Sequence, residues 1–439
     1  MISLQSAAAL ATILVATVNA ATTTSSYLPQ TSPTYLPTFA AQPGVVTSWP
    51  PANASAPLPS GALSTASFTL TGYPTINQPV ANAATDANIV AVMKTIDWTM
   101  VPNAPVTNDA YAATYPASDP YCWWTRDLCT TPKITYIPED ITICPEAGTW
   151  GLTYDDGPMY YYPVTAENSK WAEPNLYDYL LNHNNQKANL FYIGSKIVGA
   201  TAAAQRGLND GHTICVHTWS HPAMTSLTNA EVVAEFYYSL RMIKETLGIT
   251  PKCWRPPYGD VDDRVRAIAW QMGMRTIIWD QDTNDWNING DQVAPGAGAI
   301  TYATANATVE GWIKNREDGN DTTHGHITLE HELSNATITL TEFWLPTIQK
   351  LYQTMPATAC NNIAQPYWEE NFIYPIQGTV AVSTNGSTTG TKAPSTGGSS
   401  TVSGSTTTST PTVKVNAAGQ VQIMTSALGL IVAAVALVL

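Results

Sequence analysis

The chain has 439 residues, which is enough for one large domain or for two ordinary domains with tails. Charged residues make up 12% of it, about half of the rough 25% that is typical of soluble domains. The 33 acidic residues outnumber the 19 basic ones, and the formal charge of −14 argues against a nucleic-acid-binding protein, which needs clustered Lys and Arg. The 44% of apolar residues argues against a highly charged disordered protein.

The beginning of the chain has the pattern of a secretory signal peptide. An almost wholly apolar run covers residues 7–18, and the small residue Ala20 follows, which predicts residues 1–20 as a signal cleaved after Ala20. Residues 21–116 are rich in Thr, Pro, Ala and Ser, and they contain one helix-like stretch at 84–101. We expect them to form an extended N-terminal segment that packs in part on the domain behind it.

Residues from about 144 to 352 alternate short apolar runs with helix-like segments. The clearest helix covers 229–247, where apolar side chains recur at helical spacing; Thr228 can cap its start, and Gly248 can end it. Strands that alternate with helices predict an α/β domain built on a parallel sheet or a barrel. The runs that we predict to be strands are 149–154, 188–193, 213–216, 276–279 and 327–329.

Six cysteines in an oxidising compartment can pair as three disulfides. Position alone favours a local pair across a short polar loop and a second pair that ties together the ends of the central region: Cys122 with Cys129, and Cys144 with Cys360. The other two cysteines, Cys215 and Cys253, lie in apolar strand-like runs. There we expect buried thiols, which are a common state of cysteine.

Two further features follow the predicted domain. Between residues 379 and 412, 20 of 34 residues are Ser or Thr, a composition that cannot bury a core and predicts a disordered, O-glycosylated stalk. Residues 427–439 are apolar but too few for an ordinary membrane span, which needs roughly 18 residues or more. Three small residues from Asn416 and an eight-residue spacer precede this run, so the pattern predicts a GPI-attachment signal with Asn416 as the attachment residue. A poor tail anchor is the alternative.

Together these features predict a secreted protein that a GPI lipid holds at the cell surface, on the plasma membrane or in the cell wall. Five sequons agree with passage through the secretory pathway, at Asn53, Asn306, Asn320, Asn335 and Asn385. The expected organisation is a signal peptide (1–20), an N-terminal segment (21–116), one catalytic domain (117–375), a Ser/Thr-rich stalk (376–415) and the GPI-attachment signal (416–439).

Polar residues gather at the carboxyl ends of the predicted strands, where parallel α/β barrels form their active sites. In the first motif, Thr153-Tyr154-Asp155-Asp156-Gly157, adjacent carboxylates repel each other unless a cation offsets them. One of them could bind a metal while its neighbour handles protons; an ordinary acidic turn is the alternative. In the second motif, His217 and His221 can chelate one metal ion from a loop, and with one carboxylate they make a Zn²⁺ set with a position open for water. The alternative is a pair of surface histidines.

Three more motifs follow in the chain. Arg255-Pro256-Pro257-Tyr258 combines a fixed cation with a rigid loop that can aim a backbone N–H at a developing oxyanion, although a plain Pro-rich turn is an alternative. Asp282-Thr283-Asn284-Asp285-Trp286 comes next, and Leu329-Glu330-His331 ends the last predicted strand. A histidine at that place is a natural proton donor because its pKa lies near neutrality, and Asp285 could orient it. Taken alone, His331 is more often structural.

In this order, the five motifs resemble those of the polysaccharide deacetylase family, also called the NodB-homology domain or carbohydrate esterase family four. Each motif is short, but the ordered set from residue 153 to residue 331 is highly specific. The secreted layout with its stalk and GPI tail is similar to that of fungal cell-wall chitin deacetylases. The resemblance implies an irregular (β/α) barrel, and it also implies a bridge between Cys144 and Cys360.

The resemblance also implies roles for the residues of the motifs. The general base would be Asp155, kept ionised by Arg255. The general acid would be His331, oriented by Asp285, and the backbone N–H of Tyr258 would help to form an oxyanion hole. The divalent metal, most often Zn²⁺ with Co²⁺ as another possibility, would be held by Asp156, His217 and His221. The acetyl pocket would be walled by Trp286 and Leu329, while Asp282 is the less certain member of its motif.

We therefore expect a hydrolase that acts on amide bonds and converts chitin to chitosan and acetate at the cell wall. The motifs fix the chemistry but not the sugar, so another acetylated polysaccharide, such as xylan or a peptidoglycan-like glycan, is an alternative substrate. An inactive wall glycoprotein that only binds glycan is an alternative of another class. We expect a monomer whose partners are its glycan and a membrane lipid anchor, with no nucleic acid.

Overall fold

The structure is a computed structural model, and it describes residues 30–49, 72–159, 175–288 and 299–374. The predicted signal peptide, stalk and GPI-attachment signal lie outside the described residues, as do the sequons at Asn53 and Asn385. Within the described part of the chain, no helix has both the length and the apolar character that a membrane crossing needs.

Eight strands form one curled sheet in which every pairing is parallel. The strands lie in the order β5-β4-β3-β2-β1-β7-β6, and β8 pairs with the first half of β1. Only four residues of chain separate β5 from β6, so the sheet curls round on itself as an irregular (β/α) barrel, as predicted. Among the described residues, β5 and β6 do not pair with each other. The strands are β1 (Thr149–Gly157), β2 (Asn189–Tyr192), β3 (Thr213–Val216), β4 (Cys253–Trp254), β5 (Arg275–Thr276), β6 (Gln281–Asp282), β7 (His326–Leu329) and β8 (Gln353–Pro356).

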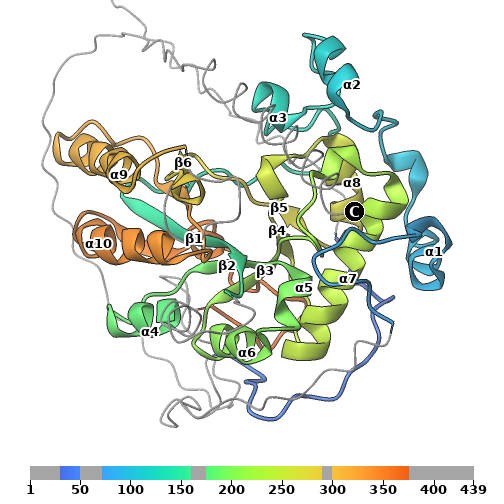
Figure 1. The fold of residues 1–439 in the computed structure, drawn as a ribbon, viewed down its shortest axis with the longest axis horizontal. Helices are drawn as coiled ribbons and strands as arrows, with labels where there is room; N and C mark the ends of the chain where they lie inside the picture. Colours follow the sequence, from blue (N-terminus) through green and yellow to red (C-terminus); the bar gives the residue numbers. More distant parts are fainter. Residues whose placement is uncertain (1–29, 50–71, 160–174, 289–298, 375–439) are drawn as a thin grey trace, which may run out of the picture.

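Helices surround the strands, with α7 and α8 on one side of the barrel and α9 and α10 on the other (Figure 1). The α-helices are α1 (Ala87–Met93), α2 (Asp109–Thr114), α3 (Trp124–Asp127), α4 (Asn175–Asn182), α5 (Gly194–Ile197), α6 (Thr201–Asn209), α7 (Asn229–Leu247), α8 (Asp263–Gln271), α9 (Tyr302–Glu317), α10 (Asn335–Leu351) and α11 (Ala357–Cys360). The 3₁₀ turns are η1 (Ala83–Thr85), η2 (Trp98–Met100), η4 (Met224–Ser226), η5 (Pro257–Gly259) and η6 (Asp285–Asn287).

The longest helix, α7, has the predicted bounds because its signals are local. Thr228 and Glu231 form a reciprocal capping box at its start, and Gly248 ends it with a left-handed φ of 73°. The predicted helix-like stretch at 84–101 is instead broken into η1, α1 and η2. The reason is that Asp86 and Asp97 each accept hydrogen bonds from backbone N–H groups that follow them, so each starts a new turn.

The predicted strand at 276–279 is also shorter than expected, because its neighbours change along its length. Thr276 pairs with β4, then Ile141 bridges Ile277, and the N–H of Asp280 donates to the carbonyl of Ile327 next to β7. The segment thus crosses from one end of the sheet to the other, and no single strand partner accompanies it.

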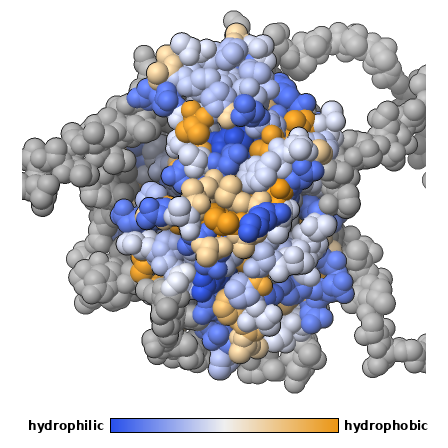
Figure 2. Space-filling view, turned by 90° about the vertical axis from the view of Figure 1, so that its right-hand side faces the viewer, coloured by the Kyte–Doolittle hydropathy of each residue, from blue (hydrophilic) through white to orange (hydrophobic). Residues whose placement is uncertain are grey.

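The described parts of the N-terminal segment pack against the barrel. Trp49 bridges Phe372 and lies 5.4 Å from the rings of both Tyr367 and Phe372, while its indole N–H donates to the carbonyl of Leu208. Helix α1 buries Ile89 and other apolar side chains in the main core, where α1 packs against α7. On the face where α1 lies, apolar side chains form small patches among hydrophilic residues (Figure 2).

Three disulfides are present, and one of them corrects our expectation. The predicted pairs Cys122–Cys129 and Cys144–Cys360 are formed. The expectation of buried thiols at Cys215 and Cys253 is wrong, because these two residues are bonded to each other. Their strands β3 and β4 are neighbours and pair Val216 with Trp254, so the cysteines one step earlier face each other with 5.1 Å between Cα atoms.

Candidate active site

The five motifs converge at the carboxyl ends of the barrel strands. Asp155 lies in the last part of β1, next to β2 on one side and bridged to His331 on the other. His217 directly follows β3, and Arg255 directly follows β4. Because all the strands are parallel, residues that are far apart in the sequence meet at this one edge.

Asp156, His217 and His221 form a cluster with the geometry of a metal site. Their ligand atoms lie within 4.8 Å of one another, and Asp156 Oδ1 is 3.5 Å from His217 Nε2 and 3.2 Å from His221 Nε2. This buried oxygen accepts no hydrogen bond from the described residues. The ring Nδ1 of His217 is 2.9 Å from the carbonyl of Arg255, which fixes Nδ1 as the donor and leaves the Nε2 lone pair for a metal. The donor set therefore fits a divalent metal such as Zn²⁺.

The protonation states of this cluster also suit a metal. Burial lowers the pKa of His221 to about 3 although Asp156 opposes the shift, so the imidazole is neutral at physiological pH. Burial would raise the pKa of Asp156, but its close contact with the His221 ring and the charge of the Lys196 ammonium hold that pKa well below its usual range. A neutral imidazole and an ionised carboxylate are the forms that coordinate metals.

Asp155 is held in place by a buried arginine. The Arg255 guanidinium, fully buried, donates to Asp155 Oδ1 and to the Thr153 hydroxyl, each at 2.7 Å. It also lies 4.1 Å from the ring centroid of Phe191, which fixes its plane. The other carboxylate oxygen of Asp155 is 3.7 Å from His217 Nε2. Asp155 therefore lies beside the metal position with one oxygen neutralised by Arg255.

His331 and Asp285 form a second buried pair on the opposite side of Asp155. Asp285 accepts hydrogen bonds from the His331 backbone N–H at 2.9 Å and from ring Nδ1 at 2.6 Å, so Nε2 is the ring nitrogen left for a substrate. Burial would lower the pKa of His331, but the Asp285 carboxylate outweighs it and raises that pKa to about 9. The imidazole is thus protonated at neutral pH and can donate a proton.

Tyr258 has a left-handed backbone with φ of 59° and ψ of 12°, and its ring is 4.6 Å from that of His221. As the second residue of η5, it has no hydrogen-bond partner for its N–H within that turn. Asp156, Thr218 and His221 also have positive φ, a conformation that costs a non-glycine residue of order 1–3 kcal/mol. Such strained positions cluster at functional sites, and here two of the four belong to the metal cluster and the other two lie next to it in sequence or in space.

The remaining predicted residues lie beside the His331–Asp285 pair. Trp286, half-buried, follows Asp285 in η6, and Leu329, buried, ends β7. Asp282 also belongs to this group, because burial raises its pKa to about 6 and the charges of His331, Asp285 and Asp155 act on it. The structure therefore brings all the predicted site residues to one edge of the barrel.

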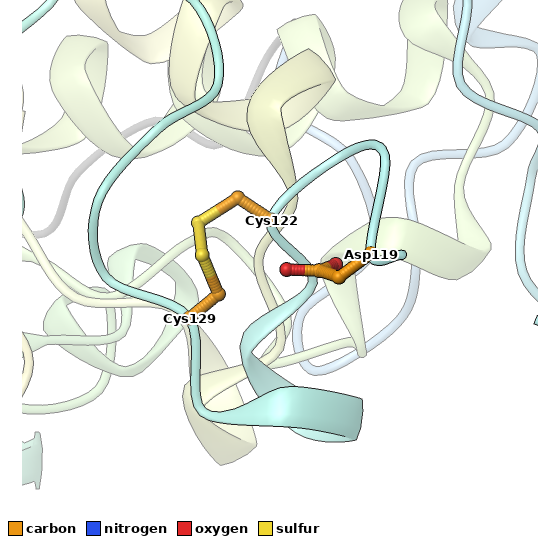
Figure 3. A group of neighbouring side chains, drawn as sticks. All are labelled: Asp119, Cys122 and Cys129. Atoms are coloured by element: carbon orange, nitrogen blue, oxygen red, sulfur yellow. A yellow bond between two sulfur atoms is a disulfide. The ribbon is translucent and has the colours of Figure 1, made fainter. Parts of the chain in front are cut away.

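A further cluster of residue types that can bind metals is not a metal site. Asp119, Cys122 and Cys129 lie together, but the two sulfur atoms are bonded to each other (Figure 3), so no thiolate is left to coordinate a metal. Asp119 instead accepts hydrogen bonds from the Tyr115 hydroxyl and the Trp123 N–H.

The chain is similar in sequence to known polysaccharide deacetylases. Residues 142–277 match the model of the polysaccharide deacetylase family. The chain is 40% identical over 315 residues to chitin deacetylase 2 of Cryptococcus neoformans var. grubii, covering 70% of this chain and 65% of that one. It is 44% identical over 292 residues to the chitin deacetylase of Amylomyces rouxii, covering 65% and 64%. The chain contains a polysaccharide deacetylase domain.

The matches cover different shares of this chain and of its relatives. The chain spans just under two thirds of the length of these two relatives. Among solved structures, the chitin deacetylase of Colletotrichum lindemuthianum is similar, with a TM-score of 0.44 and 22% identity over 53% of this chain and 97% of that one. The polysaccharide deacetylase domain begins just before β1, and its match ends in the segment that follows β5.

Two residues that support the site of the deacetylase domain were missed in the sequence. The ammonium of Lys196 donates to the backbone carbonyl of Asp156 at 2.8 Å. Glu235, buried in α7, accepts hydrogen bonds from the N–H groups of Trp219 and Ser220, which fix the loop between His217 and His221. The signal for Glu235 was a carboxylate within an apolar helix, whereas nothing local distinguishes Lys196.

Proposed function

We propose that the protein is a metal-dependent deacetylase that hydrolyses the N-acetyl groups of chitin at the cell wall, releasing acetate and leaving glucosamine units. The observation that carries the proposal is one constellation: Asp155 with its buried Arg255, and His331 with its buried Asp285, on two sides of a three-ligand metal cluster. The names of the relatives from Cryptococcus and Amylomyces support chitin as the substrate.

The metal position is assigned to Asp156, His217 and His221, and we propose Zn²⁺ because two imidazoles and one carboxylate are a Zn²⁺ donor set. When bound, Zn²⁺ would supply Lewis-acid polarisation of the acetamide carbonyl and of a water molecule. The protein provides the orientation of these ligands, since the Arg255 carbonyl fixes the His217 tautomer and Glu235 fixes the loop that carries both histidines.

The proton transfers are assigned to two residues with opposite charge states. Asp155, paired with Arg255, removes a proton from the attacking water, and the carbonyl carbon becomes tetrahedral. The Tyr258 backbone N–H stabilises the oxygen as it gains negative charge. His331, protonated at neutral pH, then donates its Nε2 proton to the departing amine, while Asp285 stabilises the imidazolium. Trp286 and Leu329 form the wall that receives the acetyl methyl group.

The proposal extends to the cellular context. We propose secretion through the predicted signal at 1–20, attachment to a GPI lipid at Asn416, and display of residues 117–375 at the cell surface on the stalk 376–415. The three disulfides of the described chain support an oxidising compartment. All the proposed catalytic residues come from one chain, so the reaction needs no residue from a second copy, and we propose a monomer.

Acetate release from a panel of glycans tests the substrate. We expect the purified protein to release acetate from chitin oligomers at a rate at least about tenfold above that from acetylated xylan or peptidoglycan fragments of equal acetyl content. Faster release from xylan or peptidoglycan would show that this glycan, and not chitin, is the preferred substrate. If protein that contains zinc releases no acetate from any of the three glycans, the result would favour the alternative of an inactive wall glycoprotein that only binds glycan.

The pH profile of acetate release tests the assignment of the general acid. Since catalysis requires protonated His331, and Asp285 raises its pKa to about 9, activity should fall as the pH rises through about 9. In Asp285→Asn the lost charge should move this alkaline limb more than one unit to lower pH and reduce the maximal rate on the order of 10²-fold. An alkaline limb at the same pH in both proteins would exclude His331 as the acid.

A further inference from the structure

A second group of metal-ligand side chains lies at the other end of β7 from the candidate active site. Asp280, His324 and His326 each offer a ligand atom, and these atoms lie within 4.8 Å of one another. His326 begins β7 and precedes His331 by five residues, which corresponds to about 16 Å along an extended strand. The register confirms the separation, because His326 pairs with Trp150 at the start of β1, whereas His331 bridges Asp155.

The two histidines are oriented as metal ligands usually are. A ligating histidine donates its second ring N–H to a carboxylate or carbonyl oxygen, which fixes the tautomer that coordinates. His326 Nε2 is 3.1 Å from Asp321 Oδ1, while its Nδ1 is 2.5 Å from Asp280 Oδ2. His324 Nδ1 is 2.8 Å from the carbonyl of Gly325, so its Nε2 carries the lone pair. His324 Nε2 is therefore available to a metal. His326 Nδ1 shares a hydrogen bond with Asp280 Oδ2 and lies 3.1 Å from Gln281 Nε2, so it would bind a metal that takes the place of the proton shared with Asp280.

The carboxylates of this group are themselves held in place. Asp280 Oδ1 accepts the backbone N–H of Ile327 at 2.7 Å, which leaves Oδ2 directed at His326. Asp321 accepts the Tyr352 hydroxyl at 2.5 Å, so its position beside His326 is fixed from a further element. The His326 side chain is only 11% exposed and that of Asp280 is 20% exposed, so the group is supported from inside the protein yet open to solvent on one side.

We propose that Asp280, His324 and His326 form a second site for a divalent transition metal, with Zn²⁺ as the best match to their chemistry. Two imidazoles and one carboxylate suit Zn²⁺ better than Mg²⁺ or Ca²⁺, which prefer oxygen ligands, and a water can complete the coordination on the open side. The metal would join the start of β7 to the segment that enters β6. These two strands lead to His331 and to Asp285, so the site fixes the register of the elements that carry this pair.

Zinc stoichiometry tests the proposal without reference to activity. The full-length protein, equilibrated with micromolar Zn²⁺ and freed of unbound metal, should contain two zinc equivalents per chain by elemental analysis. His324→Ala should contain one, because it removes a half-buried ligand whose hydrogen bond is to the adjacent residue. Asp280→Asn should also contain one, because it removes the carboxylate ligand. Its amide oxygen can still accept the Ile327 N–H, which preserves the local backbone contact. His217→Ala should lose the other equivalent, and His217→Ala/His324→Ala should contain none.

The control is His183→Ala, which removes a half-buried histidine outside both clusters and should retain two equivalents. As a second readout, added Zn²⁺ should raise the melting temperature of His217→Ala but not that of the double variant, and the metal-free melting temperatures of these two proteins should agree. The alternative is that His326 is an imidazolium held between Asp280 and Asp321. A single equivalent in the wild type that His217→Ala abolishes, or two equivalents in His324→Ala, would overturn the second site.

Discussion

Replacement of Asp155 by Asn should reduce acetate release from chitin oligomers by on the order of 10²–10⁴-fold, while the protein keeps the zinc that we propose for Asp156, His217 and His221. The amide has nearly the shape of the carboxylate and can still accept a hydrogen bond from Arg255, but it cannot take a proton from water. Because Asp155 is not one of the three proposed ligands, the loss should appear in kcat rather than in metal content. The measurement is the steady-state rate of acetate release together with zinc analysis of the same sample.

The matched control for this variant is Asp318→Asn, at the residue that directly follows α9. This residue is also paired with a cation, Lys314, but its side chain is 46% exposed, so the substitution should change neither activity nor zinc content. Asp155→Asn leaves the buried Arg255 without its counter-charge and should therefore also lower the melting temperature. If acetate release is unchanged in a folded Asp155→Asn protein, Asp155 is not the base.

The second large effect is expected from His217→Ala. Removal of one of three ligands should release the zinc of the active site, and acetate release should fall by at least about 10²-fold. His217 is 2% exposed and its Nδ1 also contacts the Arg255 carbonyl, so the loss should not be restored by moderate excess zinc. The assay compares acetate release with and without added Zn²⁺. His183→Ala is the control, and full zinc with full activity in His217→Ala would show that the metal site is wrong.

Local signals in the sequence predicted the parts of the fold that depend on local interactions. The bounds of α7 follow from its cap residues and helical periodicity, and β3 follows from a short apolar run. The site residues could be predicted because each motif ends a strand, and parallel strands bring such ends together. The Cys215–Cys253 bond could not be predicted from position, because it depends on which strands are neighbours in the sheet.

The sequence was least informative about contacts that depend on long-range packing. The Thr- and Pro-rich composition of 21–116 predicts an extended segment, but it does not identify Trp49 as a residue that packs against Tyr367 and Phe372. Similarly, Lys196 acts on the site through the backbone of Asp156. Nothing in the local sequence around a lysine on a short helix predicts that contact.

The left-handed residues around the metal cluster make the site a preorganised template. Asp156, Thr218, His221 and Tyr258 have their bent backbones because the surrounding barrel imposes them, so a metal meets ligands that need little rearrangement. The same dependence makes the template sensitive to loosening of the barrel, since relaxed residues would return to ordinary conformations. The shape of the candidate site therefore depends on the packing of the barrel around it.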